Sequence, residues 1–295
     1  MQKTLIIAST TVDMILNTPS IPLSGEDVNI SSVEYRIGGC GYNVFKAMLK
    51  QDCQAILCSP VGKGIYGGMV LKQFKAEGIE PFYLSDEENG CCFCLVEPDG
   101  ERSFLSYHGA EYLFNDSCME KIKYLDADNI YISGIDLEDP KGITGINLIK
   151  YIYDDDKFGL YFAPGNRINY IQEKRMDLIL RRRDKNGLGP FLHLNEREAL
   201  SFSGMKTVRE AALFLSDRTC NSLVITLGEQ GSYCLPVNST LGEIIPPFPV
   251  KAVNSTGAGD THFGSLIALI KKGYSLKDAC YEANKIAAIF VSVQQ

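Results

Sequence analysis

Residues 253–269 read V-N-S-T-G-A-G-D-T-H-F-G-S-L-I-A-L: small residues, an acid and then an apolar run. The pattern predicts a strand end over 249–253, a tight turn over 256–259 and a helix that opens at Asp260. Small residues let backbone N–H groups approach a ligand closely, and free N–H groups at a helix N-terminus favour an anion. The stretch therefore predicts an anion-binding turn with a carboxylate beside it.

Asp260 has two interpretations. A carboxylate beside an anion-binding turn can take a hydroxyl proton while the turn holds a transferring phosphoryl group. An acid in the first turn of a helix can also simply stabilise the helix through its dipole. The residue types alone leave both interpretations open.

Length and composition bound the class of protein. The 295 residues suffice for one large α/β domain or two small ones, with 45% hydrophobic and 22% charged residues. The net charge of −7 argues against a nucleic-acid partner. No run of about 18 apolar residues could span a membrane, and the first residues lack a signal-peptide pattern. The ten cysteines are scattered through apolar runs, as in a reducing compartment, so we expect a cytoplasmic protein without membrane partners.

Two further patterns are typical of other functions, namely a zinc or redox site and dinucleotide binding. Cys91 and Cys94 form the only C-x-x-C, but their context reads as a strand and no second pair stands nearby, so we reject a zinc or redox site. Residues 62–67 read G-K-G-I-Y-G after an apolar strand, with Asp86 about 20 residues on, which fits a dinucleotide-binding fingerprint. This is not the first strand–helix unit, and a dinucleotide there would leave the stronger loops without a role. We therefore favour packing over nicotinamide binding.

Polar and glycine-rich segments follow the first predicted strand, 4–9. Asp13 lies just past that strand, where ligands of α/β proteins usually bind, although a turn acid would look the same. Residues 38–43 read G-G-C-G-Y-N and open a helix predicted over 44–51. Such glycines bring the backbone close to a ligand, and the amide of Asn43 can donate and accept hydrogen bonds toward a polyol.

Two stretches predict small pairs of strands, and the middle of the chain predicts an α/β unit. Residues 15–36 and 90–107 alternate apolar and polar side chains around proline and glycine turns. From residue 129 the chain predicts a strand, a helix near 141–153 and a second strand. Strand–helix alternation implies a parallel sheet with helices on both faces, and no linker divides it into separate domains.

The T-G-A-G-D that opens an apolar helix (256–260), together with G-G-x-G-x-N (38–43), resembles the signatures of the ribokinase-like (PfkB) carbohydrate kinases. The resemblance covers nearly the whole chain, with the motifs in the family's order. It implies a three-layer α/β fold with a mostly parallel central sheet, helices on both faces and a small β-strand lid. It also implies one domain over 1–295, lid segments at about 15–36 and 90–107, and a homodimer formed through the lid.

The resemblance also implies catalytic and sugar-binding roles. Asp260 would be the general base, and the backbone of Gly257, Ala258 and Gly259 would form the anion hole. The sugar-binding residues that it implies are Thr11, Asp13, Gly38, Gly39 and Asn43.

Weaker motifs resemble the family's nucleotide-binding and magnesium-binding residues. Asn195-x-x-Glu198 is similar to the family's N-x-x-E, in which Glu198 would hold Mg²⁺ through water, although Asn195 would also serve as a helix cap. Residues 226–231 (T-L-G-E-Q-G) resemble the family's nucleotide loop, although a plain hairpin turn would look the same. The nucleotide-binding residues implied are Asn195, Glu198, Thr226, Gly228, Gly231, Thr256 and Asn284.

Four features depart from the family pattern. Cys40 stands where ribokinase has lysine, which argues against ribose as the substrate. Asn254 stands where members commonly have an aspartate that helps bind a monovalent cation, and the sequence ends at Gln295, before the loop that would complete that site. We therefore expect no activation by potassium. His262 replaces the usual phenylalanine; on a helix it points away from Asp260, so we expect it to pack in the core.

Together these features predict an ATP-dependent kinase that phosphorylates a primary hydroxyl of a small sugar, with ATP and Mg²⁺ as cofactors. A nucleoside kinase of the same fold is the close alternative, because stacking partners for a base cannot be located from sequence. A non-catalytic sugar-binding regulator is the other alternative, and the intact base and anion hole argue against it.

Overall fold

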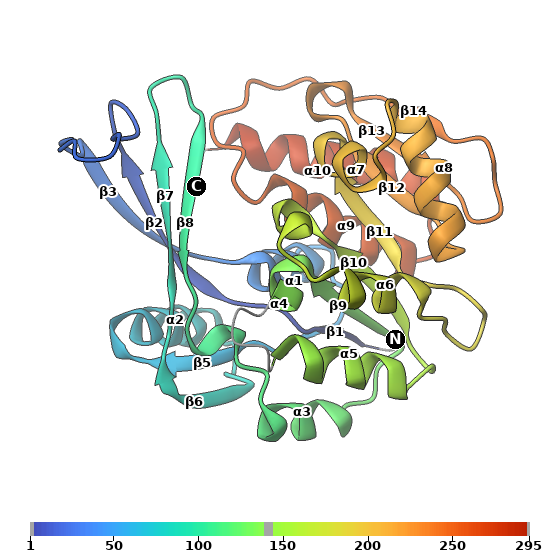
Figure 1. The fold of residues 1–295 in the computed structure, drawn as a ribbon, viewed down its shortest axis with the longest axis horizontal. Helices are drawn as coiled ribbons and strands as arrows, with labels where there is room; N and C mark the ends of the chain where they lie inside the picture. The colour runs from blue at the N-terminus through green and yellow to red at the C-terminus, as the bar shows by residue number, and fades with distance from the viewer. Residues whose placement is uncertain (1–2, 139–143, 294–295) are drawn as a thin grey trace.

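Eight strands form the central sheet, in the order β14-β13-β12-β11-β10-β9-β1-β4 (Figure 1). The structure is a computed structural model and describes residues 3–138 and 144–293. The strands from β12 to β4 in this order run parallel, and β13 and β14 are antiparallel to their neighbours, which confirms the mostly parallel sheet. The bounds are β1 (Thr4–Ile6), β4 (Ala55–Leu57), β9 (Asn129–Ser133), β10 (Gly159–Ala163), β11 (Phe191–Asn195), β12 (Leu223–Thr226), β13 (Ser232–Leu235) and β14 (Glu243–Ile245).

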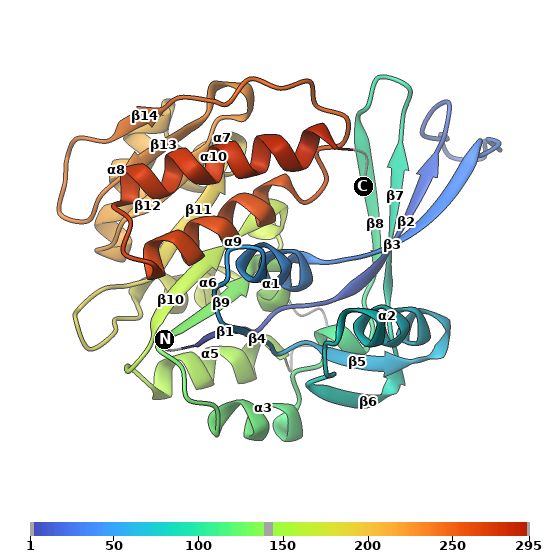
Figure 2. The same ribbon diagram turned by 180° about the vertical axis from the view of Figure 1, so that it is seen from behind.

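Helices cover both faces of the central sheet, which confirms the three-layer α/β architecture (Figures 1 and 2). One face carries α1 (Cys40–Leu49), α9 (Ala258–Lys271) and α10 (Leu276–Ser292). The opposite face carries α3 (Asp116–Lys123), α5 (Thr144–Asp154), α6 (Glu173–Arg181) and α8 (Val208–Thr219). Two short helices, α4 (Gly134–Glu138) and α7 (Glu196–Ser203), begin directly where β9 and β11 end. Among the described residues, no helix combines the length and the apolar character needed to cross a membrane.

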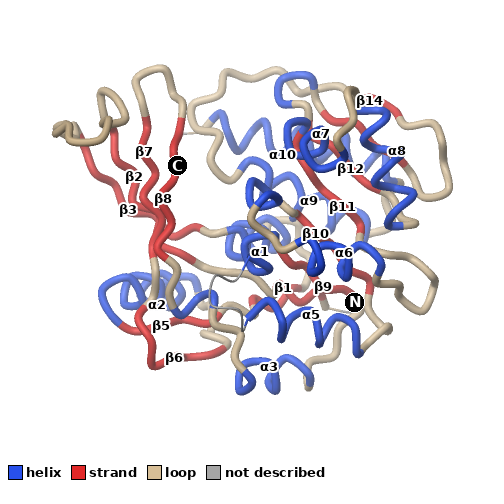
Figure 3. Tube along the Cα trace, viewed as in Figure 1, coloured by secondary structure: helices blue, strands red, loops and turns tan. Residues whose placement is uncertain are grey.

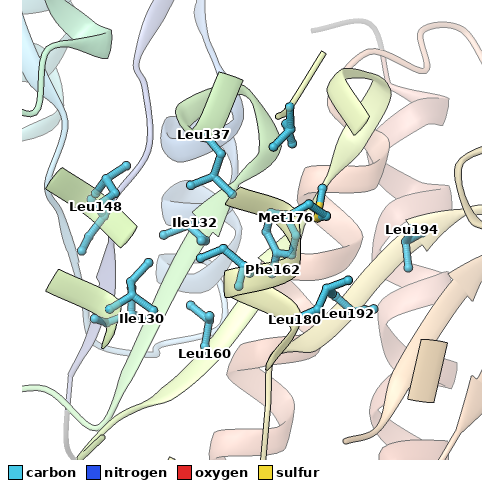
Figure 4. Packing of buried hydrophobic residues seen from close by; sticks show 14 of the residues in the cluster. Ile130, Ile132, Leu137, Leu148, Leu160, Phe162, Met176, Leu180, Leu192 and Leu194 are labelled. Atoms are coloured by element: carbon cyan, nitrogen blue, oxygen red, sulfur yellow. The ribbon is translucent and has the colours of Figure 1, made fainter. Parts of the chain in front are cut away.

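Successive side chains along each strand point to opposite faces of the sheet, so each face has its own hydrophobic core. Ile130 and Ile132 of β9 belong to the core beneath α5 and α6, whereas Tyr131 between them belongs to the core beneath α1 and α9. Figure 4 shows the first of these cores, which Phe162 and Leu192 of the next two strands also join. Successive strand side chains point to opposite faces, so a sheet that is covered on both faces requires continuous apolar runs.

A second, four-stranded sheet stands beside the central one, and we call it the lid sheet (Figure 3). Its order is β3 (Ser32–Gly38), β2 (Thr11–Asn17), β7 (Cys91–Val96) and β8 (Arg102–Tyr107). The inner pair β2–β7 is parallel, and the two outer pairs are antiparallel. Both predicted strand pairs are therefore present, and they join into one sheet.

The register gives the lid sheet two unlike faces. Asp13, Cys92 and Ser106 are direct cross-strand partners and therefore share one face. Ser106 accepts a hydrogen bond from Arg167 of η2 (Gly165–Asn169), so this face is turned toward the body of the protein, and we call it the inner face. The adjacent row, which points to the opposite outer face, consists of Tyr35, Met14, Phe93 and Leu105.

Residues 60–88 form a small β-α-β unit that packs against the lid sheet. It consists of β5 (Pro60–Lys63), α2 (Gly64–Glu77) and β6 (Tyr83–Glu88), and η1 (Ala110–Tyr112) lies against it. A Cβ on Gly62 would lie 2.5 Å from the carbonyl oxygen of Glu87 and 2.6 Å from the Cβ of Ala110. This crowding supports the packing interpretation of the glycine motif over the dinucleotide fingerprint.

The strand predicted over 249–253 is wrong. Strand β14 ends at Ile245, and the following segment has no regular structure up to the start of α9. Pro246, Pro247 and Pro249 lack the N–H donors that pairing in a sheet requires, and each fixes its own φ.

Other boundaries also differ from the prediction: β1 ends at Ile6 rather than at residue 9, and α9 begins at Ala258 rather than at Asp260. Helix α1 begins at Cys40, inside the glycine motif, rather than at residue 44. Asp13 lies within β2 rather than in a turn after β1, because the chain passes directly from the central sheet into the lid sheet. The helix predicted near 141–153 is α5, and positions 141–143 lie outside the described residues.

Gly264 allows α9 to approach α1 closely, because a Cβ there would lie 2.6 Å from the carbonyl oxygen of Val44. We predict that Gly264→Ala lowers the free energy of unfolding by about 1–3 kcal/mol, since the added methyl group forces the helices apart. In α2, a Cβ on Gly68 would meet nothing within 4 Å, so Gly68→Ala should raise that free energy by roughly 0.5–1 kcal/mol. Urea unfolding measures both, and equal effects would contradict the packing argument.

Candidate active site

Helix α9 begins at the glycine-rich turn. Gly257 caps it with a φ of 77°, a left-handed conformation that glycine adopts without strain. The N–H of Ala258 donates to the carbonyl oxygen of Ser255 at 3.1 Å, which leaves the N–H groups of Gly257 and Gly259 as the donors for an anion. Asp260 lies in the same first turn of the helix.

Asp260 is held by side chains of α1, from the other end of the chain. Asn43 Nδ2 donates to Asp260 Oδ2 at 2.9 Å, and the thiol of Cys40 donates to the same carboxylate. Burial raises the pKa of Asp260 to about 6; these two hydrogen bonds lower it, and the charge of Glu198 raises it. Such a carboxylate is a better proton acceptor than an ordinary aspartate and is still largely ionised at neutral pH.

Asp13 lies on the inner face of the lid sheet, among the predicted sugar-binding residues. Thr11 Oγ1 donates to Asp13 Oδ1 at 3.2 Å. A Cβ on Gly38 would collide with Asp13 Oδ2, and Gly39 has a φ of 90°, where a Cβ would collide with neighbouring backbone. Burial raises the pKa of Asp13 to about 6, the hydrogen bond from Thr11 lowers it, and the charge of Asp260 raises it. The electrostatic contact between Asp13 and Asp260 brings the two predicted halves of the site together.

The structure adds Asp136, a buried carboxyl that sequence analysis missed. Asp136 Oδ2 accepts hydrogen bonds from Ser133 Oγ at 2.7 Å and from the Ser133 N–H at 3.2 Å. Burial raises the pKa of Asp136 to about 7. Burial also raises the pKa of the Cys40 thiol well above its usual value, and the charges of Asp260, Asp136 and Asp13 raise it further. Three carboxyl groups therefore surround this thiol, and the position of Asp136 just past a central strand was the signal available in the sequence.

A cavity of about 700 Å³ lies against the glycine-rich turn. This volume is in the usual range for a small-molecule site. Of the predicted nucleotide-binding residues, those that line it are Thr226, Gly228, Gly231 and Asn284, joined by Ala258 and Gly259 of the turn. The segment wrongly predicted as a strand supplies another wall through Pro249, Val250 and Ala252, together with Pro247 and Phe248 just before it.

A buried chain of polar side chains ends at this cavity. Asn284 Nδ2 donates to the carbonyl oxygens of Ile245 and Pro246, at 3.2 and 3.0 Å, which directs its Oδ1 toward His262 Nε2 at 3.0 Å. Because the amide oxygen of Asn284 can only accept, His262 carries its proton on Nε2. His262 Nδ1 is then the acceptor for His193 Nε2, which lies 2.9 Å away, so His193 also carries its proton on Nε2. Burial lowers the pKa of His262 to about 4 and that of His193 well below its usual value. The prediction that His262 packs in the core is confirmed, and its ring also lines the cavity.

Asn195 and Glu198 form the capping box of α7. Asn195 Oδ1 accepts from the N–H of Glu198 at 2.8 Å, and Glu198 Oε2 accepts from the N–H of Asn195 at 3.0 Å, which confirms the capping alternative. Burial raises the pKa of Glu198, and its hydrogen bonds with Asn195 lower it. In the described part of the chain, no cluster of three or more His, Cys, Asp and Glu could enclose a metal. Mg²⁺ keeps most of its waters and needs one or two carboxylates plus phosphates, so Glu198, whose charge reaches Asp260, fits this ion.

A second residue that sequence analysis missed joins the lid sheet to the loop before the glycine-rich turn. Arg102 of β8 donates from Nη2 to Asn254 Oδ1 at 3.0 Å and from Nη1 to Ser255 Oγ at 2.8 Å. Asn254 Oδ1 also accepts from the N–H of Thr256 at 2.9 Å, and Thr256, the first residue of the turn, is not among the described residues that line the cavity. No sequence pattern links residues so far apart in the chain.

The sequence and the fold are similar to those of known proteins. The sequence model of the pfkB family of carbohydrate kinases matches residues 1–295. The chain is 27% identical over 292 residues to the uncharacterized sugar kinase YegV of Escherichia coli K12, which covers 97% of this chain and 88% of that protein.

Solved structures show the same fold. The ribokinase of Cryptococcus neoformans in complex with ADP has a TM-score of 0.76 at 20% identity, covering 100% of this chain and 95% of the other. The nucleoside kinase of Burkholderia thailandensis in complex with inosine has a TM-score of 0.79 at 16% identity, covering 100% and 92%. The fold is therefore ribokinase-like, as the motifs implied. The chain belongs to the pfkB family of carbohydrate kinases and is an ATP-dependent kinase.

Proposed function

We propose that the protein transfers the terminal phosphoryl group of ATP to a primary hydroxyl of a small sugar. The observation that carries this proposal is the position of Asp260 between the two halves of the site. Asn43 of the N-terminal motif holds its carboxylate, and the turn immediately before it lines the cavity through Ala258 and Gly259. A proton acceptor, a set of anion donors and a nucleotide-sized cavity therefore meet at one helix end.

In the proposed mechanism, Asp260 takes the hydroxyl proton as the acceptor oxygen bonds to phosphorus and the bond between phosphorus and the ADP oxygen breaks. The N–H groups of Gly257 and Gly259, with the positive end of the α9 dipole, stabilise the charge on the transferring phosphoryl group. The proton is then released from Asp260 to solvent. The raised pKa of Asp260 suits this role because it makes the carboxylate a stronger base.

The sugar would lie beneath the lid sheet, against its inner face. We assign Asp13 and Asn43 to hydrogen bonds with the sugar hydroxyls, with Thr11 fixing the carboxylate of Asp13. Because Gly38 and Gly39 have no Cβ, their backbone lies directly against this carboxylate and against the backbone of Ser9 and Thr11. In this arrangement the lid sheet and the body of residues 1–295 act as one catalytic unit, and the lid sheet keeps away water that would otherwise accept the phosphoryl group.

We assign the cavity to the nucleotide. Thr226, Gly228 and Gly231 would lie along it, with Thr256 beside the phosphates. The amide of Asn284 is engaged inside the protein, so its contribution is to shape the wall near the base. Glu198, oriented by Asn195, would hold Mg²⁺ through water, and the ion when bound neutralises charge on the phosphates.

A nucleoside kinase is the second candidate, because the B. thailandensis nucleoside kinase shares the fold over the whole chain. The same base and anion hole would serve either acceptor, since both present a primary hydroxyl. The two candidates differ only in what occupies the space under the lid sheet, so an acceptor panel separates them.

ATP consumption measured with a panel of sugars and nucleosides tests the proposed function. We expect turnover with at least one small sugar, and Asp260→Asn should lower kcat by about 10²–10⁴-fold because it removes the general base. ATP with Mg²⁺ should still raise the Tm of the variant, since ligand binding stabilises the folded state. Turnover of nucleosides alone would select the second candidate, and a variant with wild-type kcat would remove Asp260 from the mechanism.

The pH profile of the wild type is the internal control for this experiment. The value of kcat/KM should fall as the pH drops through about 6, because protonated Asp260 cannot accept a proton and the pKa of Asp13 also lies near 6. The two carboxyl groups interact, so the fall reports values that belong to the pair. The residual activity of Asp260→Asn should show a shallower fall.

We also propose that the protein works without a monovalent cation. Asn254 carries no charge, and its carbonyl oxygen is already engaged by Arg102 and by the N–H of Thr256. Activity in potassium and in tetramethylammonium buffers of equal ionic strength should therefore differ by less than about threefold, or ~0.7 kcal/mol in the barrier. Activation by an order of magnitude in potassium would contradict the proposal, and Asn254→Asp is the variant in which we expect such activation to be larger.

We also propose that the protein is cytoplasmic and that it forms a homodimer through the outer face of the lid sheet. Tyr35, Val33 and Leu105 on that face are 50%, 49% and 61% exposed, and exposed apolar patches of this kind mark interfaces. Light scattering should give twice the 32.6 kDa mass of one chain, and Leu105→Glu should give a monomer. Leu241→Glu, at another exposed leucine, is the control and should remain dimeric. A monomeric wild type would contradict the proposed dimer.

A further inference from the structure

Arg102 reaches from the lid sheet to the loop behind the proposed anion hole. It is the first residue of β8 and, like Ser106 four residues on, it projects from the inner face. Its guanidinium donates to Asn254 Oδ1 at 3.0 Å and to Ser255 Oγ at 2.8 Å. The planar fork of arginine suits two acceptors held at neighbouring positions.

Asn254 passes this contact on to the turn. Its Oδ1 accepts two hydrogen bonds, one from Nη2 of Arg102 and one, at 2.9 Å, from the N–H of Thr256. Thr256 directly precedes Gly257, the residue that caps α9. A continuous path of hydrogen bonds therefore runs from the lid sheet, through one amide side chain, to the backbone that enters the turn.

The charge of Arg102 distinguishes it from the other arginines near the lid sheet. Arg36 pairs with Glu34 at 2.6 Å, and Arg167 pairs with Glu138 at 3.3 Å. Both hydrogen-bond acceptors of Arg102 are neutral, and none of the ion pairs between described residues involves it. Among the described residues, its positive charge is therefore not paired with a carboxylate, and its guanidinium binds the loop that leads into the proposed anion hole.

We propose that Arg102 is a positioning residue that couples the placement of the lid sheet to the formation of the anion hole. When the lid sheet covers the acceptor, Arg102 fixes the amide of Asn254, and Asn254 fixes Thr256 and the turn after it. When the lid sheet is displaced, the turn loses this support. The donors of the anion hole are therefore supported while the lid sheet is in position and lose this support when it moves away, which limits transfer to water. This inference rests on the proposed function.

Kinetics of single and double variants test the coupling. We expect Arg102→Ala to lower kcat by about 10–100-fold, the usual effect of losing charged hydrogen bonds, with KM for ATP changed by less than about threefold. Arg102→Lys, which keeps the charge but not the fork, should lie between Ala and wild type, and added guanidinium should partly rescue Arg102→Ala. If Arg102 acts through Asn254, the double variant with Asn254→Ala should be no slower than the slower single variant. Effects that multiply would overturn the proposal.

Arg181→Ala is the matched control, because Arg181 is 73% exposed in its side chain and pairs with Asp177 of its own helix α6. It should leave kcat and KM unchanged.

Hydrogen exchange supplies a readout that does not depend on turnover. Without any ligand, the amides of 256–259 should exchange several-fold faster in Arg102→Ala than in wild type or in Arg181→Ala. Unchanged exchange at these amides would overturn the coupling even if activity fell. A wild type that phosphorylates nothing would refute the proposed function, while the exchange experiment would still decide whether Arg102 orders the turn.

Discussion

The hydrogen bond between Asn43 and Asp260 joins two residues that are 217 positions apart in the sequence, and the rest of the site depends on it. It forms because α1 and α9 lie side by side on one face of the central sheet, with Gly264 allowing the two backbones to meet near Val44 (Figure 2). The first helix carries Asn43, one of the residues assigned to the acceptor, and the second carries Asp260, the proposed base, in its first turn. A small change in the spacing of these helices would therefore separate the two halves of the chemistry.

The same arrangement concentrates ionisable groups whose effects on stability oppose one another. The pKa values of Asp13, Asp260 and Asp136 lie above their ordinary value of 3.8, so the folded state binds more protons than the unfolded state and the free energy of unfolding decreases as the pH rises from about 4 to 7. His262 has the opposite effect. Its pKa of about 4 lies below the ordinary 6.5, so the free energy of unfolding decreases as the pH falls through this interval. Burial of these carboxyl groups therefore lowers stability at neutral pH, which is common where groups are arranged for catalysis.

Sequence reasoning could predict the parts of this structure that depend on local patterns. The apolar runs of the central strands, the turn before Asp260 and the helix after it are all encoded within short windows. The family resemblance then supplied the order of the layers. The segment 249–253 was misread because its apolar residues resemble a strand, whereas Pro249 and the two prolines just before the segment oppose pairing in a sheet, and the segment lines the cavity instead. Arg102 and Asp136 were missed because their importance comes from contacts with distant elements, which no periodicity records.

The topology of the lid sheet has a consequence for how the chain folds. Strands β2 and β7 are neighbours, yet α1, β4, β5, α2 and β6 all lie between them in the sequence. Closing so long a loop is entropically costly, so this pairing is expected to form late, after β7 and β8 have joined as a local hairpin. During synthesis, β2 and β3 leave the ribosome before β7 does. Until β7 is made, the edge of β2 that will pair with it stays unpaired. The sheet that would cover the acceptor is thus expected to be completed only when its two antiparallel halves, formed separately, join at β2 and β7.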